Sequence, residues 1–439
     1  MTRKPRLTAW AEVARMCVRI PNMGPLILSS VMASLAAGVL SPVMPLFLRD
    51  RGITFAGLGL IFSLGAAAPV LLQPIVGWLA DRVGRRIMVV GTSFVLSLLL
   101  PIYVFIRDVT GFAVIQAARS AVNTSSSPAT SAMLGDIIPA TDRATLFGVY
   151  GSVQTLAYVV ALFASGYLLR LGADFNAAFY GSSALFLLSS FVLLFGVRET
   201  MSPAGAGAPA AGSSAGATTV TGAGEAKHQR AAGGYLPALA DIRNRVRAVF
   251  SDRTLLGLVL LRFWFQLGLG GFPIYLPLLA QECGAPREMI GPIVATAWLT
   301  FAVMQPIGGR LSDRHRERRL PLMYLGIVLL IINGAALVAA RGLLWVVLLW
   351  ACTGIGDGLF RPGFSALVVD TVPAAQRGSY FGVVGSASTL AGVISPLVCG
   401  ALAAAGGIQA AFYIAPVSWV LGIASLLLLV RRTGARAAA

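Results

Sequence analysis

Four charged side chains lie deep within long apolar stretches of the chain: Arg119, Arg262, Asp357 and Arg361. A charged group in an apolar environment is expensive, so each of them needs a partner or contact with water. Asp357 and Arg361 are four residues apart and would share one face of a helix. At 1.5 Å per helical residue, Arg262 is expected within a few ångströms of the depth of Asp357. We therefore predict that Asp357, Arg361 and Arg262 form a proton-coupling group, with Asp357 as the acid that carries the proton. The alternative is an ion pair that only locks one helix against its neighbours.

A second polar stripe precedes these residues by about half the chain. At an offset of 234 in the numbering, Asn123 and Ser127 align with Asp357 and Arg361, and Arg119 comes one helical turn before Asn123. Both stretches would thus present polar groups along one helical stripe. A charged group at membrane depth needs a partner or a wet cavity, whereas for any single amide a hydrogen bond that only packs two helices is the commoner role. The predicted cavity residues are Arg119, Asn123, Ser126, Ser127 and Gln266.

Other chemistries lack the residues that they need. The two histidines and four cysteines are scattered without metal-ligand spacing, so we expect no metal and no cofactor. A phosphate-binding loop of the GxxxxGK[ST] type is absent, which argues against hydrolysis of ATP by this chain. An enzyme would need a catalytic constellation, and the sequence shows none.

The composition identifies the elements that must hold the charged residues. Of the 439 residues, 57% are hydrophobic and only 12% are charged, and the mean hydropathy is +0.80. A soluble domain has about 25% charged residues, whereas a membrane-spanning helix needs about 20 apolar residues. We predict an all-α membrane protein with twelve transmembrane helices. The expected spans are 26–48, 55–79, 87–106, 111–137, 145–169, 176–197, 254–279, 289–311, 320–340, 343–369, 379–404 and 408–430.

The basic residues predict the orientation. Most of the 34 Lys and Arg residues lie in the termini and in the even-numbered loops, and positive residues mark the cytoplasmic side. The first apolar run is too long for the core of a signal peptide, so we expect it to be the first span. These observations predict a multi-pass protein of the cell's inner (plasma) membrane with both termini in the cytoplasm.

The chain divides at a segment of low complexity. Residues 201–234 are almost all Ala, Gly, Ser, Thr and Pro, which favours a disordered linker. We expect a cytoplasmic N-terminal segment at 1–25, a six-helix half at 26–200, a largely disordered cytoplasmic linker at 201–253, a second six-helix half at 254–430 and a cytoplasmic tail at 431–439. Residues 242–250 have the apolar spacing of a helix on the membrane surface.

The two halves repeat each other in sequence. Residues 131–156 (SAMLGDIIPATDRATLFGVYGSVQTL) align with 365–390 (SALVVDTVPAAQRGSYFGVVGSASTL) at an offset of 234. An even number of spans separates the copies, so both halves should have the same orientation. The fold expected is two parallel six-helix repeats.

With these two repeated halves, the chain resembles the major facilitator superfamily. The resemblance covers all twelve spans, and its most specific part is GWLADRVGRR at 77–86, which is similar to the family's motif between helices two and three. It implies that Asp81 latches the halves through the start of helix eleven, near 378–381, when the protein faces outward. The alternative is a loop that only fixes the orientation in the membrane. The cytoplasmic gate expected from this motif and its second copy comprises Gly77, Asp81, Arg82, Gly84, Arg85, Arg86, Asp313 and Arg314.

The resemblance also implies a function. Arg119 is similar to an arginine of the drug:proton antiporters in this family, which favours a secondary transporter that exports small amphipathic molecules by alternating access. Aromatic residues near the cavity-lining helices suit such a ligand, although core or lipid-facing positions are commoner for residues of this kind; they are Phe263, Trp264, Phe265, Phe272, Tyr275 and Phe360. Proton-coupled uptake of a metabolite and a non-transporting membrane sensor remain as alternatives. The expected partners are a small-molecule substrate, the proton and membrane lipid, with no nucleic acid, and we expect a monomer.

Overall fold

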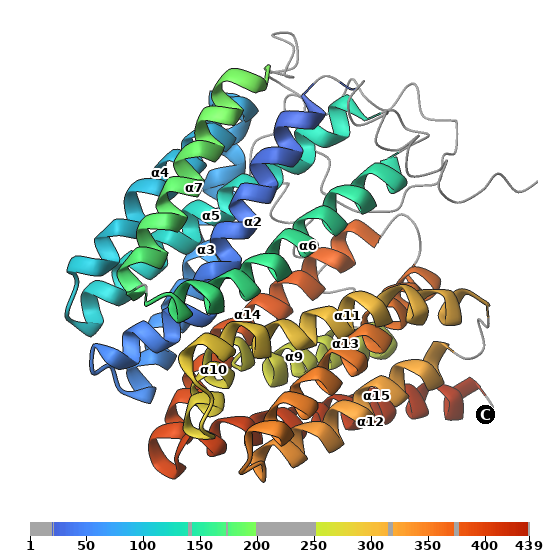
Figure 1. Ribbon diagram of the computed structural model, residues 1–439. Coiled ribbons are helices and arrows are strands. Elements are labelled where there is room, and N and C mark those ends of the chain that lie inside the picture. Colours follow the sequence, from blue (N-terminus) through green and yellow to red (C-terminus); the bar gives the residue numbers. More distant parts are fainter. Residues whose placement is uncertain are drawn as a thin grey trace, which may run out of the picture.

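The computed structural model describes residue 20 and residues 22–138, 143–172, 174–198, 252–314, 319–372 and 377–437. Only the backbone is described at 71–83, 127–128, 131–132, 135–136, 143–145, 147–148, 313–314, 319, 369–370, 377–379, 381 and 428–437. All regular elements in these residues are helices (Figure 1). They are α2 (Met23–Asp50), α3 (Phe55–Val83), α4 (Arg85–Phe105), α5 (Val109–Ile137), α6 (Arg143–Arg170), α7 (Phe175–Gly196), α9 (Arg253–Leu269), α10 (Phe272–Glu282), α11 (Arg287–Arg314), α12 (Arg319–Val338), α13 (Leu343–Thr371), α14 (Arg377–Gly406), η4 (Ile408–Tyr413) and α15 (Ile414–Ala437).

These helices make twelve spans, because α9 and α10 form one span and η4 and α15 form another. Ten of the spans are long and apolar enough to cross a bilayer. The other two are α3, whose described apolar part is Phe55–Val70, and α5, whose interior is rich in hydroxyl groups. The predicted all-α fold is confirmed. The expected linker at 201–253 and the expected surface helix at 242–250 lie outside the described residues, except for Asp252 and Arg253.

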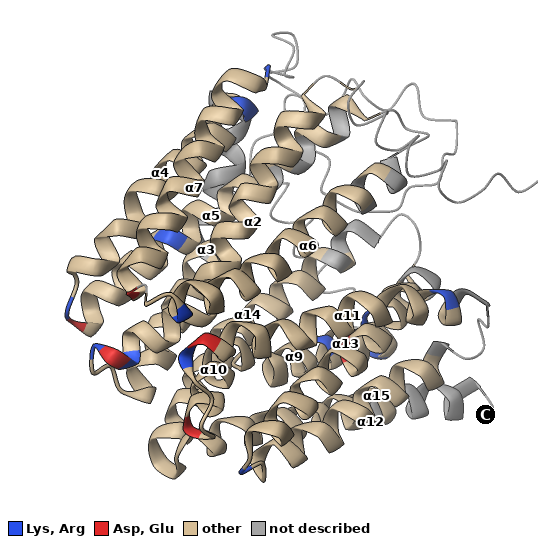
Figure 2. Ribbon diagram, viewed as in Figure 1, with Lys and Arg blue, Asp and Glu red and all other residues tan. Residues whose placement is uncertain are grey.

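The bundle has two ends, which we name by their connections. Short turns such as 51–54, 106–108 and 283–286 close the end that we call the loop end. The other end, where α7 ends and α9 begins, is the linker end. Side-chain caps fix two helix starts at opposite ends: Asp108 accepts a hydrogen bond from the Gly111 N–H, and Asp252 accepts bonds from the N–H groups of Thr254 and Leu255. Figure 2 shows that charged residues gather at the two ends and are sparse between them.

The spans form two groups of six that repeat each other. In the first group, α2 packs on α6 and α7, and α5 packs on α3 and α4. In the second group, α13 packs on α11 and α12, and α9 packs on α14 and α15. Both the first and the last residues of α5 and α13 are related by the offset found in the sequence. The repeat therefore extends to helix length and helix ends.

The first span of the second half is broken, unlike its counterpart α2. Helix α9 ends at Leu269 and α10 begins at Phe272, with Gly270 and Gly271 between them. A Cβ atom at Gly271 would overlap the Cys399 sulfur, so only glycine permits this approach to α14. Inside a membrane the carbonyl groups at a helix end need partners. Ser395 of α14 donates a hydrogen bond to the Leu267 oxygen at 2.7 Å, and Trp419 of α15 donates one to the Phe265 oxygen at 3.2 Å.

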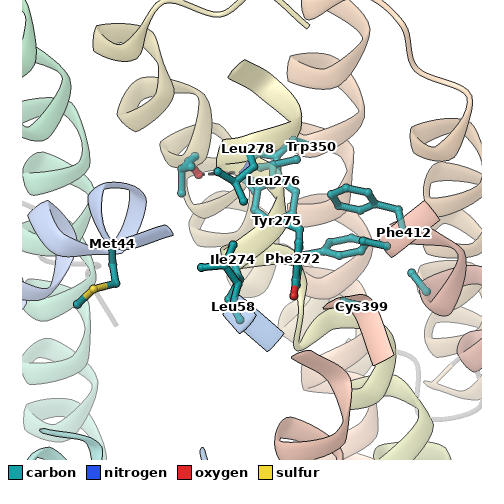
Figure 3. Packing of buried hydrophobic residues seen from close by; sticks show 14 of the residues in the cluster. Met44, Leu58, Phe272, Ile274, Tyr275, Leu276, Leu278, Trp350, Cys399 and Phe412 are labelled. Atoms are coloured by element: carbon teal, nitrogen blue, oxygen red, sulfur yellow. Dashed lines mark hydrogen bonds between the residues drawn. The ribbon is translucent and has the colours of Figure 1, made fainter. Parts of the chain in front are cut away.

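Aromatic side chains fill the core of the second half next to this break. Figure 3 shows Phe272 beside Phe412, with Tyr275 on the same helix. The ring centroids of Phe272 and Phe412 are 5.2 Å apart, and those of Phe272 and Trp350 are 5.8 Å apart. Such tilted ring pairs add to the stabilisation from buried area. The core thus fixes α10 against α13 and η4.

Candidate functional site

Asp357 and Arg361 form an ion pair inside α13. The Arg361 Nε donates to the Asp357 Oδ1, and the two residues are one helical turn apart. The Asp357 side chain is 12% exposed and the Arg361 side chain is 35% exposed, so the acid lies beneath the arginine. The Arg361 guanidinium also lies 5.5 Å from the ring centre of Phe301 in α11. The pair therefore satisfies the charge of Asp357 within its own helix and leaves one side of Arg361 accessible.

Arg262 joins this pair from α9. Its guanidinium lies 5.5 Å from the ring centre of Phe265, and Phe265 stacks on Phe360 of α13 with ring centroids 3.9 Å apart. This stacking brings the interior of α9 against α13. As a result, Arg262 interacts electrostatically with both Asp357 and Arg361. The structure thus brings together the three residues that the sequence predicted as one group, and we call them the acidic centre.

Arg119 lies in a separate polar group in the first half. The Arg119 Nε donates to the Gln116 Oε1 at 3.2 Å, and the Tyr103 hydroxyl donates to the same oxygen at 2.6 Å. Gln116 and Tyr103 are buried. We call Tyr103, Gln116 and Arg119 the amide centre, because a neutral amide oxygen accepts both bonds. The sequence does not single out Tyr103 as a partner, since it lies on a different helix, α4.

The remaining predicted cavity residues extend these two centres. Asn123 lies one turn after Arg119 and is exposed, and its backbone oxygen accepts a hydrogen bond from the Ser126 hydroxyl at 2.9 Å. Gln266 lies one turn after Arg262 and is partly exposed. The side chain of Ser127 lies outside the described part of the chain. The exposed side of Asn123 shows that the stripe on α5 reaches open space.

The aromatic residues expected near a ligand are instead part of the protein core. Phe265, Phe272, Tyr275 and Phe360 are each at most 1% exposed. They pack against one another and against Trp419 and Phe412, so they offer no surface to a substrate. For these four residues the structure shows packing within the second half, which is the alternative that the sequence left open.

The two halves contact each other near the loop end. Helix α3 meets α14 where the Ser63 hydroxyl donates to the Val393 oxygen at 2.6 Å. Tyr275 of α10 donates from its hydroxyl to the oxygens of Phe55 and Pro396, at 3.1 and 3.2 Å. At the surface, Asp50 of the first half and Arg287 of the second form an ion pair of 3.0 Å.

Glycines show that the halves diverge toward the linker end. On α6, a Cβ at Gly166 would overlap the Glu288 oxygen of the other half, whereas a Cβ at Gly151 would meet no atom within 4 Å. These glycines are about four turns apart and share a helix face. The equivalent pair on α14 behaves in the same way, because Gly400 touches Phe55 of the first half while Gly385 faces open space. The space between the halves therefore opens toward the linker end.

The predicted gate motif is described in part. Gly84 has φ = 102°, a conformation that favours glycine, and it separates α3 from α4. Arg85 and Arg86 form the first turn of α4, and Arg86 donates a hydrogen bond to the Leu194 oxygen of α7. Gly77 lies in α3. The side chains of Asp81, Arg82, Asp313 and Arg314, and the proposed contact of Asp81 with 378–381, lie outside the described part of the structure.

Comparison with known proteins decides the family. Residues 26–331 and 258–439 match the family model described as Major Facilitator Superfamily. The chain belongs to the major facilitator superfamily. As a member of this superfamily it is a multi-pass membrane protein and a secondary transporter of small molecules, not an enzyme. The predicted family and its two six-helix repeats are confirmed.

Within the superfamily, the chain is distantly similar to a multidrug efflux pump and to a quinolone resistance protein. It is 24% identical over 373 residues to the "Multi-drug resistance efflux pump PmrA homolog" of Lactococcus lactis, a match that covers 82% of this chain and 83% of that protein. It is 25% identical over 174 residues to the "Quinolone resistance protein NorA" of Staphylococcus aureus, covering 38% of this chain and 43% of that protein.

Two solved superfamily structures have the same fold. A bacterial homolog of the human lysosomal transporter Spinster, in an inward-facing and unoccupied conformation, matches with a TM-score of 0.71 and 15% identity, over 92% of this chain and 94% of that one. The nucleoside transporter NupG matches with a TM-score of 0.71 and 14% identity, over 93% and 98%. At these identities the likeness concerns the fold alone.

Proposed function

We propose that this superfamily member is a proton-coupled exporter of small amphipathic molecules, placed in the inner (plasma) membrane with both termini in the cytoplasm. The observation that carries the proposal is the acidic centre, where Asp357 lies beneath Arg361 and near Arg262. An acid held at membrane depth between arginines is a group that can exchange a proton. The name of the PmrA homolog, an efflux pump, supports the direction of transport, and the name of NorA, a quinolone resistance protein, agrees with it.

The chemistry at Asp357 follows from its ion pair. When ionised, the carboxylate accepts the hydrogen bond from Arg361 and offsets one of two neighbouring positive charges. When a proton binds, the carboxyl group becomes neutral, and the attraction for Arg361 and Arg262 is lost. Arg361 is then released toward the open space on its exposed side. A cationic substrate favours the ionised form of Asp357, so substrate and proton compete for the same charge.

Alternating access connects this chemistry to the geometry of the halves. If the basic loops mark the cytoplasm, the linker end is the cytoplasmic end. The halves are closed at the loop end and separated at the linker end, so this conformation faces inward. Export requires a second conformation in which the loop end opens. The proposed latch from Asp81 to the start of α14 belongs to that second conformation.

The test is transport by the purified full-length chain in proteoliposomes, with and without a pH gradient. Ethidium, an amphipathic cation, and a quinolone serve as probes. Asp357→Asn is expected to abolish accumulation driven by the gradient and to preserve downhill exchange, because the amide mimics the protonated acid. Asp174→Asn, at an exposed helix start, is the matched control and should behave as the unmodified protein does.

Three results would contradict the proposal. Full proton-driven accumulation by Asp357→Asn would assign coupling to another group or another ion. Gradient-driven movement in the opposite direction would indicate uptake. No flux of either probe or of a panel of metabolites, from a protein that still binds them, would indicate a sensor.

A further inference from the structure

An apolar groove runs between α4 and α7. Figure 1 shows these two helices on the side of the first half that faces away from the second half. Its volume is about 360 Å³. It extends from Arg86, in the first turn of α4, to Phe94, about 12 Å further along that helix. Its walls are otherwise apolar apart from one serine, and it is lined by Arg86, Ile87, Val90, Gly91, Phe94, Leu187, Ser190, Phe191 and Leu194.

The groove opens sideways, where the protein meets the membrane. Ile87, Phe94 and Phe191 on its rim are 59%, 46% and 47% exposed. Apolar side chains that are this exposed on a spanning helix face hydrocarbon. An occupant therefore reaches the groove from the membrane rather than from water.

Hydrogen bonds hold the two walls together and fix the shape of the groove. Ser190 of α7 donates to the Val90 oxygen of α4 at 3.2 Å. Arg86 of α4 donates to the Leu194 oxygen of α7, which orients its guanidinium at the linker end of the groove. Next to Val90, the absence of a side chain at Gly91 leaves the groove open, since a Cβ there would meet no atom within 4 Å.

Positive charge is concentrated at this end of the groove. Arg85 and Arg86 lie in the first turn of α4, where the helix dipole adds partial positive charge. Arg198 follows α7 by two residues and is exposed. Figure 2 shows basic residues at the linker ends of both helices. A phosphate at this level would face arginines, while a chain attached to it would enter an apolar groove.

We propose that the groove between α4 and α7 binds an anionic phospholipid from the leaflet at the linker end. One acyl chain lies along Val90, Gly91 and Phe94, and the headgroup phosphate lies against Arg86 and Arg85. Guanidinium groups suit a phosphate because they present several N–H donors in one plane. The site is separate from the acidic and amide centres, and it does not depend on the proposed direction of transport.

The experiment measures lipid binding by the full-length protein in detergent, from the shift in its thermal unfolding when lipid is added. Phosphatidylglycerol is compared with phosphatidylcholine of the same chains, and glycerol phosphate represents the headgroup alone. Phosphatidylglycerol is expected to give the largest shift, and glycerol phosphate none. Gly91→Phe fills the groove and is expected to weaken binding of both lipids roughly tenfold, the equivalent of about two buried CH₂ groups.

Matched variants separate the groove from general effects on stability. Gly91→Ala adds only a methyl group and should keep lipid binding. Gly181→Phe adds the same ring on α7, where a Cβ also meets no atom within 4 Å, and should keep it too. Arg86→Gln should reduce the preference for phosphatidylglycerol over phosphatidylcholine about fivefold, as expected for one basic residue near a membrane surface.

The proposal is overturned by any of three results. One is an equal shift with both lipids in the unmodified protein. Another is lipid binding by Gly91→Phe that equals that of Gly91→Ala. The third is a shift with glycerol phosphate alone, which would identify a site for a soluble anion. Should Gly91→Phe fail to fold, the lipid preference of Arg86→Gln decides, because a purely structural role of Arg86 would not change that preference.

Discussion

The amide centre and the acidic centre occupy the same stripe of two repeated helices, yet they bind an arginine within the bundle in different ways. In α5, Arg119 shares a neutral amide oxygen with Tyr103. In α13, Arg361 bonds a carboxylate, and the position equivalent to Arg119 is Thr353, which accepts a hydrogen bond from Asn333. The position of Arg119 is therefore polar in both halves but charged only in the first. One half carries a fixed positive charge, and the other carries a charge that a proton can remove.

The largest effect is expected at the acidic centre. Arg361→Gln leaves the carboxylate of Asp357 without its ion-pair partner, which should lower the free energy of unfolding by about 3 kcal/mol. That value is at the low end for a buried pair, since the arginine is one-third exposed. The double variant Asp357→Asn, Arg361→Gln should recover most of this loss, because no uncompensated charge remains. Denaturant unfolding in detergent measures both. Losses that simply add would show that the two residues do not act as a pair.

A smaller effect is expected at the amide centre. Gln116→Leu removes the acceptor of two hydrogen bonds and leaves buried donors unsatisfied, which should lower the free energy of unfolding by about 2 kcal/mol. Gln116→Glu keeps an acceptor at the same place and serves as the control, with little loss expected. The same unfolding measurement checks both. If Gln116→Leu is as stable as the unmodified protein, the difference between the two centres does not affect the stability of the fold.

The smallest effect is expected for the Asp50–Arg287 ion pair at the loop end. This prediction tests whether the acidic centre and the amide centre open to the same side of the bundle. Asp50→Asn weakens an exposed ion pair worth about 0.2 to 1 kcal/mol. It should therefore favour the conformation open at the loop end by at most about fivefold. Reporter cysteines at Asn123 and Gln266, without the exposed Cys352, give the labelling rate of each half from the linker side. Both rates should fall together, and Arg287→Lys should change neither. Opposite changes in the two labelling rates would mean that the amide centre and the acidic centre open to different sides of the bundle.

The sequence was sufficient for the fold because length, hydropathy and an internal repeat are properties of the chain itself. Apolar runs long enough to cross a bilayer predicted the spans, and the offset of 234 predicted the relation between α5 and α13. The similar depth of Arg262 and Asp357 was also predicted, since residues on helices of known direction have a predictable depth.

Contacts between helices were beyond the sequence. Periodicity gives the face and the depth of a residue but not its neighbour on another helix, so Tyr103 of α4 could not be assigned to Gln116 and Arg119 of α5. For the same reason Phe265 and Phe360 could be read as ligand contacts, whereas they stack on each other. The break at Gly270 was missed because a pair of glycines is common in spanning helices, and only the approach of α14 makes it necessary.

That break has a consequence for the order in which the protein is assembled. The groups that satisfy the carbonyls of Leu267 and Phe265 belong to Ser395 and Trp419, which are synthesised 128 and 154 residues later. At 17 residues and 1.5 Å per residue, α9 is about 25 Å long and too short to cross the membrane without α10. A nascent chain that has inserted only as far as α10 therefore holds the Leu267 carbonyl, one of the last four of α9, without its final partner. The corresponding first span, α2, is one unbroken helix, so it can cross the membrane before any later helix has been made.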